Sequence, residues 1–348
     1  MTARTPRAER SIPIARPAGS DSSPSRTVAV EARGLTKIFG TNRAVDAIDL
    51  TVMEGEIFGV LGPNGAGKTT MLNMLATLLP IDGGEARIFG YDVRRQGHAV
   101  RQLIGVTGQF ASVDENLTGR ENLWLFGRLQ GLSSKRARSI GDDLLAQFDL
   151  TESADRPISQ FSGGMRRRLD LAASLITRPA LIFLDEPTTG LDPRNRSQMW
   201  DTIRDLVAEG STILLTTQYL DEADALAGRI AVIDHGRKVA EGTPAQLKAQ
   251  IGASSLRVQM SEDADTAAAV ALAAEVTGDT PVVSPIGSGF SVTLHDANQA
   301  ADVLVALRNH RLDITNATVE QPSLDEVFFA LTGHTCTCPI PDTEASNP

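Results

Sequence analysis

The segment EIFGVLGPNGAGKTTMLNMLATLLP, residues 56–80, decides the fold class of this chain of 348 residues. Its first part, Glu56 to Gly62, is a short apolar run that predicts a buried strand. From Gly67 to Pro80 the apolar residues recur at helical spacing, which predicts a helix. The apolar face of that helix would hold Leu72, Leu75 and Leu79. A strand that leads through a glycine-rich loop into a helix predicts an anion-binding α/β unit.

The loop GPNGAGKT, residues 62–69, fits the phosphate-loop pattern. Glycines let the backbone wrap an anion, and N–H groups at the helix N-terminus supply a positive field. We expect Lys68 to reach the β- and γ-phosphates of ATP, and the hydroxyl of Thr69 to bind Mg²⁺. The predicted nucleotide-binding set is Gly62, Pro63, Asn64, Gly65, Ala66, Gly67, Lys68, Thr69 and Thr70. A glycine-rich turn without a ligand is the alternative, and the strand before and the helix after the loop argue against it.

Three more apolar runs predict further strands, ALIFLD at 180–185, STILLTT at 211–217 and RIAVIDH at 229–235. Such near-continuous runs are typical of parallel strands covered on both faces. Helices are predicted between them at Asn195–Glu209 and Leu220–Leu226. The predicted fold class is therefore α/β.

Two acidic residues end the run LIFLDE. Asp185 is placed to hold Mg²⁺ through its water shell, and Glu186 lies one residue further out. A carboxylate there can orient and deprotonate a water for attack on the γ-phosphate, so Glu186 is the predicted base. The alternative is a pair of helix-capping acids, but a solvated cap does not need a buried strand before it.

A second anion site is predicted at FSGGM, residues 161–165. The hydroxyl of Ser162 and the unhindered N–H groups of Gly163 and Gly164 open a helix, and a helix N-terminus attracts anions. The apolar face of this helix would hold Leu169, Ala172, Ala173 and Ile176. Taken alone, the segment fits a glycine-containing N-cap equally well.

The chain divides into four predicted parts, a disordered basic tail at 1–27, a nucleotide-binding domain at 28–252, a small α+β domain at 253–333 and a flexible tail at 334–348. The second part contains a helical insert at about 117–178, with two helices between Leu117 and Phe148. The third part has a regulatory or interaction role by default and ends in a helix that starts at Ser323. Its apolar stripe, Leu324, Val327, Phe328 and Leu331, predicts a core or dimer contact.

Composition narrows the function classes. A formal net charge of −10 argues against a general nucleic-acid-binding surface. No apolar run is long enough to span a bilayer. The arginine-rich N-terminal tail is read as solvated, with weak attraction to anionic lipid as the alternative. The sequence has two cysteines, Cys336 and Cys338, so a reducing cytoplasm and no disulfide framework are expected. Together with His334 they supply one ligand too few for a closed zinc site.

GPNGAGKT, FSGGM, LIFLDE and the following GLDP, in that order, resemble the ATP-binding-cassette ATPases over about Val28 to Gly252. The resemblance implies a P-loop NTPase with a helical subdomain, and a dimer in which each ATP lies between one phosphate loop and the partner's FSGGM signature. It also implies that Phe39 stacks on adenine, that Gln109 reaches Mg²⁺ and the coupling surface, and that Asp192 touches the other protomer. Without the resemblance, Phe39 would be interpreted as an ordinary core residue and Gln109 as an ordinary surface residue.

The chain departs from that family in two places. The signature begins with Phe161 and ends with Met165, where Leu and Gln are commoner, and its phosphate-contacting residues are intact. After the run STILLTT the family usually has a histidine that contacts the γ-phosphate, and this chain has Gln218. A neutral amide is a poor acid or base but can orient water. Gln218 is therefore predicted to act as a catalytic sensor and water clamp.

A finer resemblance, to the daunorubicin-resistance-type drug-export ATPases of actinomycetes, extends to about Gly333. It is carried by MRRRLDLAASLI, TTQYLDEAD, IAVIDHGRKVAEGTP and LDEVFFALTG. It implies an ATPase on the cytoplasmic face of the membrane that drives efflux of a drug-like or other hydrophobic compound through a separate permease, two copies of each. An importer ATPase and a soluble non-transport ATPase are the alternatives.

Overall fold

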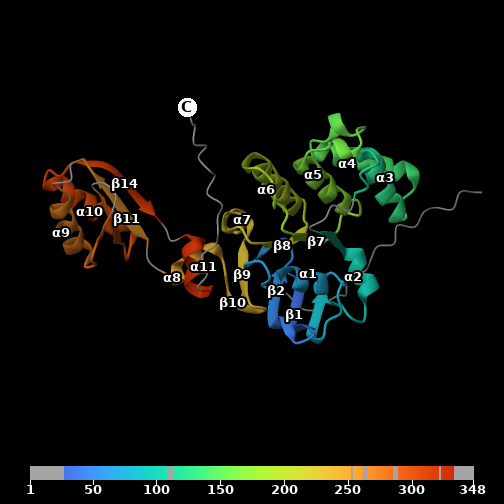
Figure 1. Cartoon of the computed structure of the whole chain (residues 1–348), viewed down its shortest axis with the longest axis horizontal. Helices are drawn as coiled ribbons and strands as arrows, with labels where there is room; N and C mark the ends of the chain where they lie inside the picture. Colours follow the sequence, from blue (N-terminus) through green and yellow to red (C-terminus); the bar gives the residue numbers. More distant parts are fainter. Residues whose placement is uncertain are drawn as a thin grey trace, which may run out of the picture.

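The computed structural model describes residues 27–108, 113–251, 254–261, 265–284, 289–320 and 323–332. Within these ranges the strands form three sheets (Figure 1). The first two sheets and the helices around them form the nucleotide-binding part. The third sheet and its helices follow towards the C-terminus.

The central sheet has six strands in the order β10-β9-β3-β8-β7-β6. They are β3 (Ile57–Leu61), β6 (Ile104–Thr107), β7 (Leu181–Asp185), β8 (Thr212–Thr217), β9 (Arg229–Asp234) and β10 (Arg237–Gly242). Neighbours from β9 to β6 are parallel, and β10 pairs antiparallel with β9. β3, β7 and β8 are buried along their whole length, which confirms the predicted parallel strands. Their carboxyl ends meet at one edge of the sheet.

Both faces of the central sheet are covered. On β7, Phe183 belongs to the hydrophobic cluster that includes α1 (Lys68–Leu75), and Leu184 belongs to the cluster on the opposite face. The opposite face packs against α5 (Gly163–Ser174) and α6 (Pro193–Ala208). Alternate residues of a strand face opposite sides of the sheet, so a continuous apolar run contributes to the hydrophobic clusters on both faces.

The helix after the phosphate loop is shorter than the sequence predicts. The expectation of a helix to Pro80 is wrong, because α1 ends at Leu75. Thr77 has a φ of 64°, in the left-handed region that ends helices. The N–H groups of Leu78 and Leu79 both donate to the carbonyl of Asn73, in place of helical bonds. Leu79 still packs against the core from this turn.

A four-stranded antiparallel sheet, which the sequence patterns did not predict, lies on the far side of α1. Its order is β2-β1-β4-β5, and its strands are β1 (Val28–Phe39), β2 (Asn42–Met53), β4 (Gly83–Ile88) and β5 (Tyr91–Asp92). Val45, Ile48 and Leu50 of β2 are buried with Met71 and Leu72 of α1. This sheet therefore holds α1 against the central sheet.

The helical insert begins with α3 (Gly119–Leu129) and α4 (Ser134–Gln147). α2 (Gly97–Leu103) precedes it. A capping box starts α3, in which Thr118 accepts from the Glu121 N–H and the Glu121 side chain accepts from the Thr118 N–H. Leu123 of α3, Leu145 of α4 and Leu169 of α5 share one cluster with the central sheet. The two helices predicted in this insert are confirmed.

The C-terminal sheet has the order β12-β13-β11-β14. Its strands are β11 (Ser255–Met260), β12 (Val282–Val283), β13 (Gly289–Thr293) and β14 (Ile314–Glu320). Two helices, α9 (Thr266–Thr277) and α10 (Ala297–Asn309), bury Ala273 and Val303 with Val258 and Phe290 of the sheet.

The last described helix, α11 (Leu324–Thr332), packs on the nucleotide-binding part (Figure 1). It contacts α7 (Leu220–Leu226), α8 (Pro244–Ile251) and β10. The predicted stripe lies in this contact, because Leu324, Val327 and Phe328 cluster with residues of α7, α8, β3 and β9, and Leu331 packs against that cluster. The predicted domain boundary near residue 252 stays a proposal. α11 follows that boundary in the sequence but packs against the nucleotide-binding part.

Candidate active site

The phosphate loop joins β3 to α1 at the carboxyl edge of the central sheet. Gly67 has a φ of 102°, and a Cβ at Gly67 or at Gly62 would collide with a backbone carbonyl, from Ala44 or Ile233. Only glycine therefore fits these two positions. The Lys68 ammonium donates to the carbonyls of Gly62 at 2.8 Å and Pro63 at 3.1 Å, so it lies under the loop.

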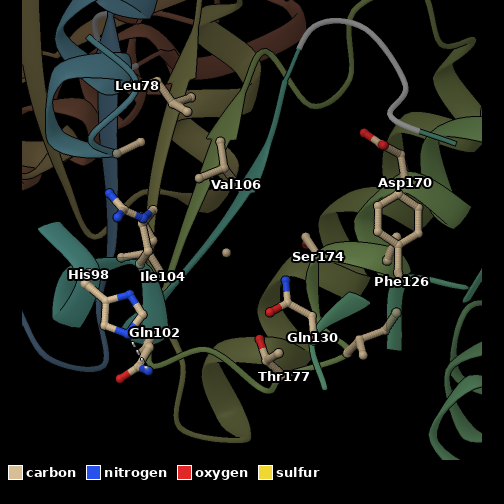
Figure 2. A pocket seen from close by; sticks show the side chains of 15 residues that line it. Leu78, His98, Gln102, Ile104, Val106, Phe126, Gln130, Asp170, Ser174 and Thr177 are labelled. Atoms are coloured by element: carbon tan, nitrogen blue, oxygen red, sulfur yellow. Dashed lines mark hydrogen bonds between the residues drawn. The ribbon is translucent and has the colours of Figure 1, made fainter. Parts of the chain in front are cut away.

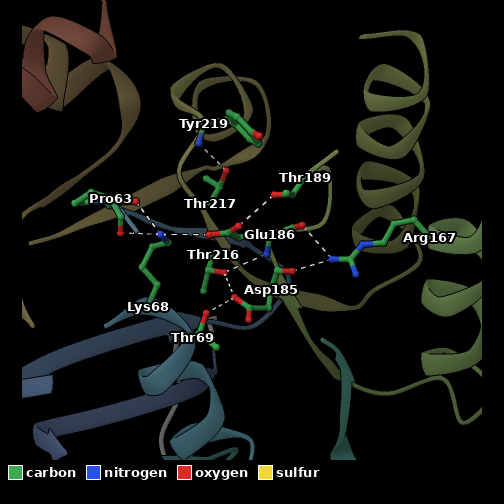
Figure 3. A network of polar contacts seen from close by, with 11 residues as sticks. Pro63, Lys68, Thr69, Arg167, Asp185, Glu186, Thr189, Thr216, Thr217 and Tyr219 are labelled. Carbon is green, nitrogen blue, oxygen red and sulfur yellow. Dashed lines mark hydrogen bonds and ion pairs between the residues drawn. The ribbon is translucent and has the colours of Figure 1, made fainter. Parts of the chain in front are cut away.

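Asp185 ends β7 directly beside this loop (Figure 3). Its Oδ1 accepts from the Thr69 hydroxyl at 3.0 Å and from the Thr216 hydroxyl at 2.5 Å. Thr69 begins the helix and Thr216 belongs to the neighbouring β8. The hydroxyl and carboxylate oxygens of Thr69 and Asp185 are the hard ligands that Mg²⁺ prefers. Asp185 and Thr69 thus fit the predicted Mg²⁺ position.

Glu186 follows Asp185 and its side chain turns towards Lys68 (Figure 3). Its Oε1 lies 3.5 Å from the Lys68 Nζ, and its Oε2 accepts from the Thr189 hydroxyl at 3.2 Å. The backbone has a φ of 47°, in the left-handed region. The Glu186 N–H donates to the carbonyl and the hydroxyl of Thr216. Lys68, Thr69, Asp185 and Glu186 are therefore brought together as the sequence predicted.

Gln218 lies at the same edge, directly after β8, and is half-buried. The carbonyl of its neighbour Thr217 accepts from the Gly62 N–H at 3.3 Å, which places Gln218 beside the phosphate loop. Phe39 ends β1 and is 48% exposed, with the Lys37 ammonium 5.3 Å from its ring centroid. A partly exposed ring suits stacking better than core packing. Gln109 lies outside the described residues.

The second predicted anion site lies at the start of α5. Ser162 caps this helix by accepting from the Met165 N–H at 3.2 Å, and Ser162 and Gly163 are exposed. Gly164 packs against the side chain of Asn195, which donates to Asp192 at 2.6 Å. The exposed signature and Asp192 therefore lie together. The departure at Phe161 is explained by packing, because its ring is buried in the core of the helical insert.

Two residues that the sequence analysis did not single out complete the site. Arg167 of α5 binds the backbone around Asp185 and Glu186, and burial lowers the pKa of its guanidinium. Glu222 of α7 is fully buried and accepts from the Thr188 hydroxyl at 2.7 Å and the Trp200 indole at 3.3 Å. The signal for Arg167 was the run of three arginines directly after the signature. The sequence offers no such signal for Glu222.

Burial raises the pKa of Glu222, with the nearby Asp221 acting in the same direction, so its protonated form stabilises the fold. This contribution is complete below the unfolded-state pKa of about 4.5 and is lost as the pH rises through the folded-state value. Glu222→Gln removes the titration and keeps an acceptor for Thr188 and Trp200. Its free energy of unfolding relative to the parent should therefore increase with pH, by up to about 1.4 kcal/mol per pH unit in that window.

Denaturant unfolding at a series of pH values measures this difference. Glu209→Gln is the matched control, because Glu209 is exposed and its Oε1 accepts from Gln147. The control measures the effect of replacing a carboxylate by an amide at an exposed site. A difference between Glu222→Gln and the parent that stays constant with pH would show that the Glu222 carboxyl titrates alike in both states.

A dedicated metal cage is not part of the described structure, where no cluster of three His, Cys, Asp or Glu side chains is found. Mg²⁺ is usually bound by one or two carboxylates and substrate phosphates, so Asp185 with Thr69 is a suitable donor set. The alternative of a zinc site at His334, Cys336 and Cys338 lies outside the described residues. Within those residues, too, every helix is too short or too polar to cross a bilayer.

Comparison with known proteins places this geometry in a family. Residues 45–189 match the family model described as ABC transporter, and residues 242–332 match that of the ATP-binding protein DrrA1-3-like C-terminal domain. The daunorubicin/doxorubicin resistance ATP-binding protein DrrA of Streptomyces peucetius is 52% identical over 308 residues, covering 88% of this chain and 93% of that protein. The chain belongs to the ATP-binding subunits of ABC transporters.

Other relatives of this ABC ATPase agree. The Nod factor export ATP-binding protein I of Sinorhizobium fredii is 42% identical over 321 residues, covering 90% of each chain. A solved ATP-binding subunit of an ABC transporter aligns with a TM-score of 0.58 at 26% identity, covering 64% of this chain and 92% of that one. A dimeric cassette bound to ADP and Pi aligns with a TM-score of 0.57 at 26% identity, covering 62% and 98%.

The α/β P-loop fold and the resemblance to drug-export ABC ATPases are thereby confirmed. As a member of this family the subunit binds nucleotide and hydrolyses ATP to drive transport. The loop at Gly62–Thr69, the strand end at Asp185 and the signature at Ser162–Gly164 stay the predicted catalytic parts of the cassette.

Proposed function

We propose that this ABC ATPase powers export of a drug-like or other hydrophobic compound through a separate membrane permease. The proposal rests on sequence similarity to proteins named for drug resistance or export. This similarity covers both the nucleotide-binding part and the C-terminal part of the chain. An importer or a soluble factor is less well supported, because the matched C-terminal domain is the one named for the resistance proteins. The relatives' different names leave the cargo open between an antibiotic and another hydrophobic compound.

The hydrolytic roles are proposed from the geometry of the described residues and from the family resemblance. We assign Lys68 to the β- and γ-phosphates, and Thr69, Asp185 and Gln109 to Mg²⁺, whose charge would stabilise the phosphates during transfer. Glu186 takes the proton of the attacking water, since its carboxylate is fixed by Thr189 and lies near Lys68. Gln218 orients that water through its neutral amide. Phe39 stacks on adenine from the end of β1.

Two copies of the chain are proposed to enclose two ATP molecules. The exposed Ser162 and Gly163 of one copy would face the nucleotide on the phosphate loop of the other, with Asp192 at the contact. Helix N-termini stabilise anions, so each γ-phosphate would be bound from both sides. The similar cassette that is dimeric with ADP and Pi supports this arrangement.

A cavity of about 740 Å³ offers a place for the permease. Figure 2 shows Phe126 of α3 and its C-cap Gln130 on one side and Ile104 and Val106 of β6 on the other. β6 ends at Thr107, two residues before Gln109 in the sequence. This position on the cytoplasmic face of the membrane would couple ATP binding to transport.

Gln130→Trp tests the proposed contact by filling the cavity. Overpacking costs about 1–3 kcal/mol, so copurified permease and drug efflux should fall by about fivefold or more. ATP binding should stay within about twofold, because no nucleotide contact changes. The control is Gln147→Trp on α4, which lines a different cavity, of about 510 Å³. Equal permease recovery for the parent and both variants would contradict the contact, and lack of any associated permease would contradict the transport function.

A further inference from the structure

The side chain of Arg167 binds four backbone carbonyls that belong to two separate segments. Its Nε donates to Pro187 at 3.0 Å, and its Nη2 donates to Asp185 at 2.8 Å and Glu186 at 3.0 Å. Its Nη1 donates to Gly108 at 2.6 Å. One guanidinium therefore joins three consecutive residues around the proposed base to Gly108, the residue directly before Gln109. Figure 3 shows Arg167 pointing at Asp185 and Glu186.

This contact is made at a buried position. The Arg167 side chain is only 14% exposed, and its Nη1 lies 4.0 Å from the Asp170 carboxylate. Burial lowers the pKa of Arg167, as expected for a cation that loses water. The planar guanidinium has five donors in fixed directions, which a lysine ammonium cannot reproduce. The site is thus built for several carbonyls rather than for one anion.

The backbone that Arg167 binds is strained. Glu186 adopts a φ of 47°, which costs energy for a residue with a side chain and persists only where the surroundings fix it. Thr216 holds the N–H side of this residue, and Arg167 holds its carbonyl and those of both neighbours. Together the two contacts fix the peptide planes on either side of Glu186. They thereby set the direction in which its carboxylate points.

We propose that Arg167 is a positioning residue for ATP hydrolysis that ties the orientation of Glu186 to α5. The proposal rests on the assignment of Glu186 as the base. α5 begins at Gly163, directly after its N-cap Ser162, and carries Arg167 on its second turn, so a shift of this helix moves the guanidinium and the carbonyls bound to it. A nucleotide bound at the signature would thus act on the base of the same chain, and would link the two sites of a dimer.

Arg167→Ala should lower kcat by about 10–100-fold, because small displacements of a catalytic group have effects of this size. The KM for ATP should stay within about twofold, since the phosphate loop does not change. Arg167→Lys should recover part of kcat, because a lysine can reach some of the carbonyls. Arg168→Ala is the matched control and should keep parental kcat. Arg168 lies on the same helix and donates to Gln198 at 2.8 Å.

The deciding measurement combines Arg167→Ala with Glu186→Gln and follows single-turnover ATP cleavage. If Arg167 acts through Glu186, its loss should cost less than about twofold once the carboxylate is gone. The same fold-loss in both backgrounds would reveal a merely structural contact and overturn the proposal. The proposal would also be overturned if Arg167→Ala had the kcat of the parent. If the alanine variant does not fold, a parental kcat in Arg167→Lys would overturn it in the same way. A Glu186→Gln variant with parental turnover would instead refute the base.

Discussion

Glu186→Gln is expected to lower ATP turnover by about 10²–10⁴-fold, the usual contribution of a general base. The amide has the shape of the carboxylate and can still accept from Thr189, but Lys68 loses its charge partner, so the site should keep its shape at a lower stability of the fold. ATP affinity should change little, because the base acts on water and the phosphates are bound by the loop and Lys68. Phosphate release under saturating ATP and a nucleotide-binding titration measure the two quantities separately.

The same variant tests the proposed dimer. With hydrolysis blocked, ATP and Mg²⁺ should hold two copies together, and sedimentation should show a dimer that disappears without nucleotide. A strict monomer, with and without the permease, would argue against the shared nucleotide site. Gln218→Ala is the comparison for turnover. Loss of a positioning hydrogen bond should cost at most about 10²-fold, and parental turnover would exclude the water-clamp role.

The meeting of the proposed catalytic residues could be predicted because Glu186 and Gln218 each stand directly after an apolar run. β3 and β7 are buried on both faces, and parallel strands deliver the residues that follow them to one edge. Lys68 and Asp185 can therefore be expected at the same site although they are far apart in the sequence. Arg167 follows no such rule. Its partners are carbonyl groups, which every residue has, so the sequence does not show which ones it binds.

Other parts of the fold depend on tertiary contacts that the local sequence does not record. β1 and β2 alternate between buried and exposed residues, with bulges that interrupt the period, and only their packing on α1 selects the buried face. α1 stops at Leu75 although the apolar pattern continues, because the chain turns at Thr77. The stripe on α11 predicted a contact surface, but the sequence could not tell that α7 and α8 cover it.

Lys68→Ala is expected to weaken ATP binding and to destabilise the fold. Lys68 is 4% exposed and Glu186 7%, and their charged atoms lie 3.5 Å apart. Removal of one partner of a buried ion pair leaves an uncompensated charge and typically costs about 3–5 kcal/mol of the free energy of unfolding. ATP affinity should fall about 10–100-fold, because hydrogen bonds to charged groups contribute about 1.5–3 kcal/mol.

The two effects separate in the double variant Lys68→Ala with Glu186→Gln. A neutral amide needs no cation, so denaturant unfolding should show part of the lost stability restored, while a nucleotide titration should show affinity still low. Equal stability of the single and double variants would mean that the ion pair contributes nothing.

Lys248→Ala is the surface control, since its pair with Asp224 is closer, at 2.7 Å, but the two side chains are 19% and 41% exposed. Its loss should cost about 1 kcal/mol or less. The longer ion pair should thus matter more, because burial has a larger effect here than the distance between the charges.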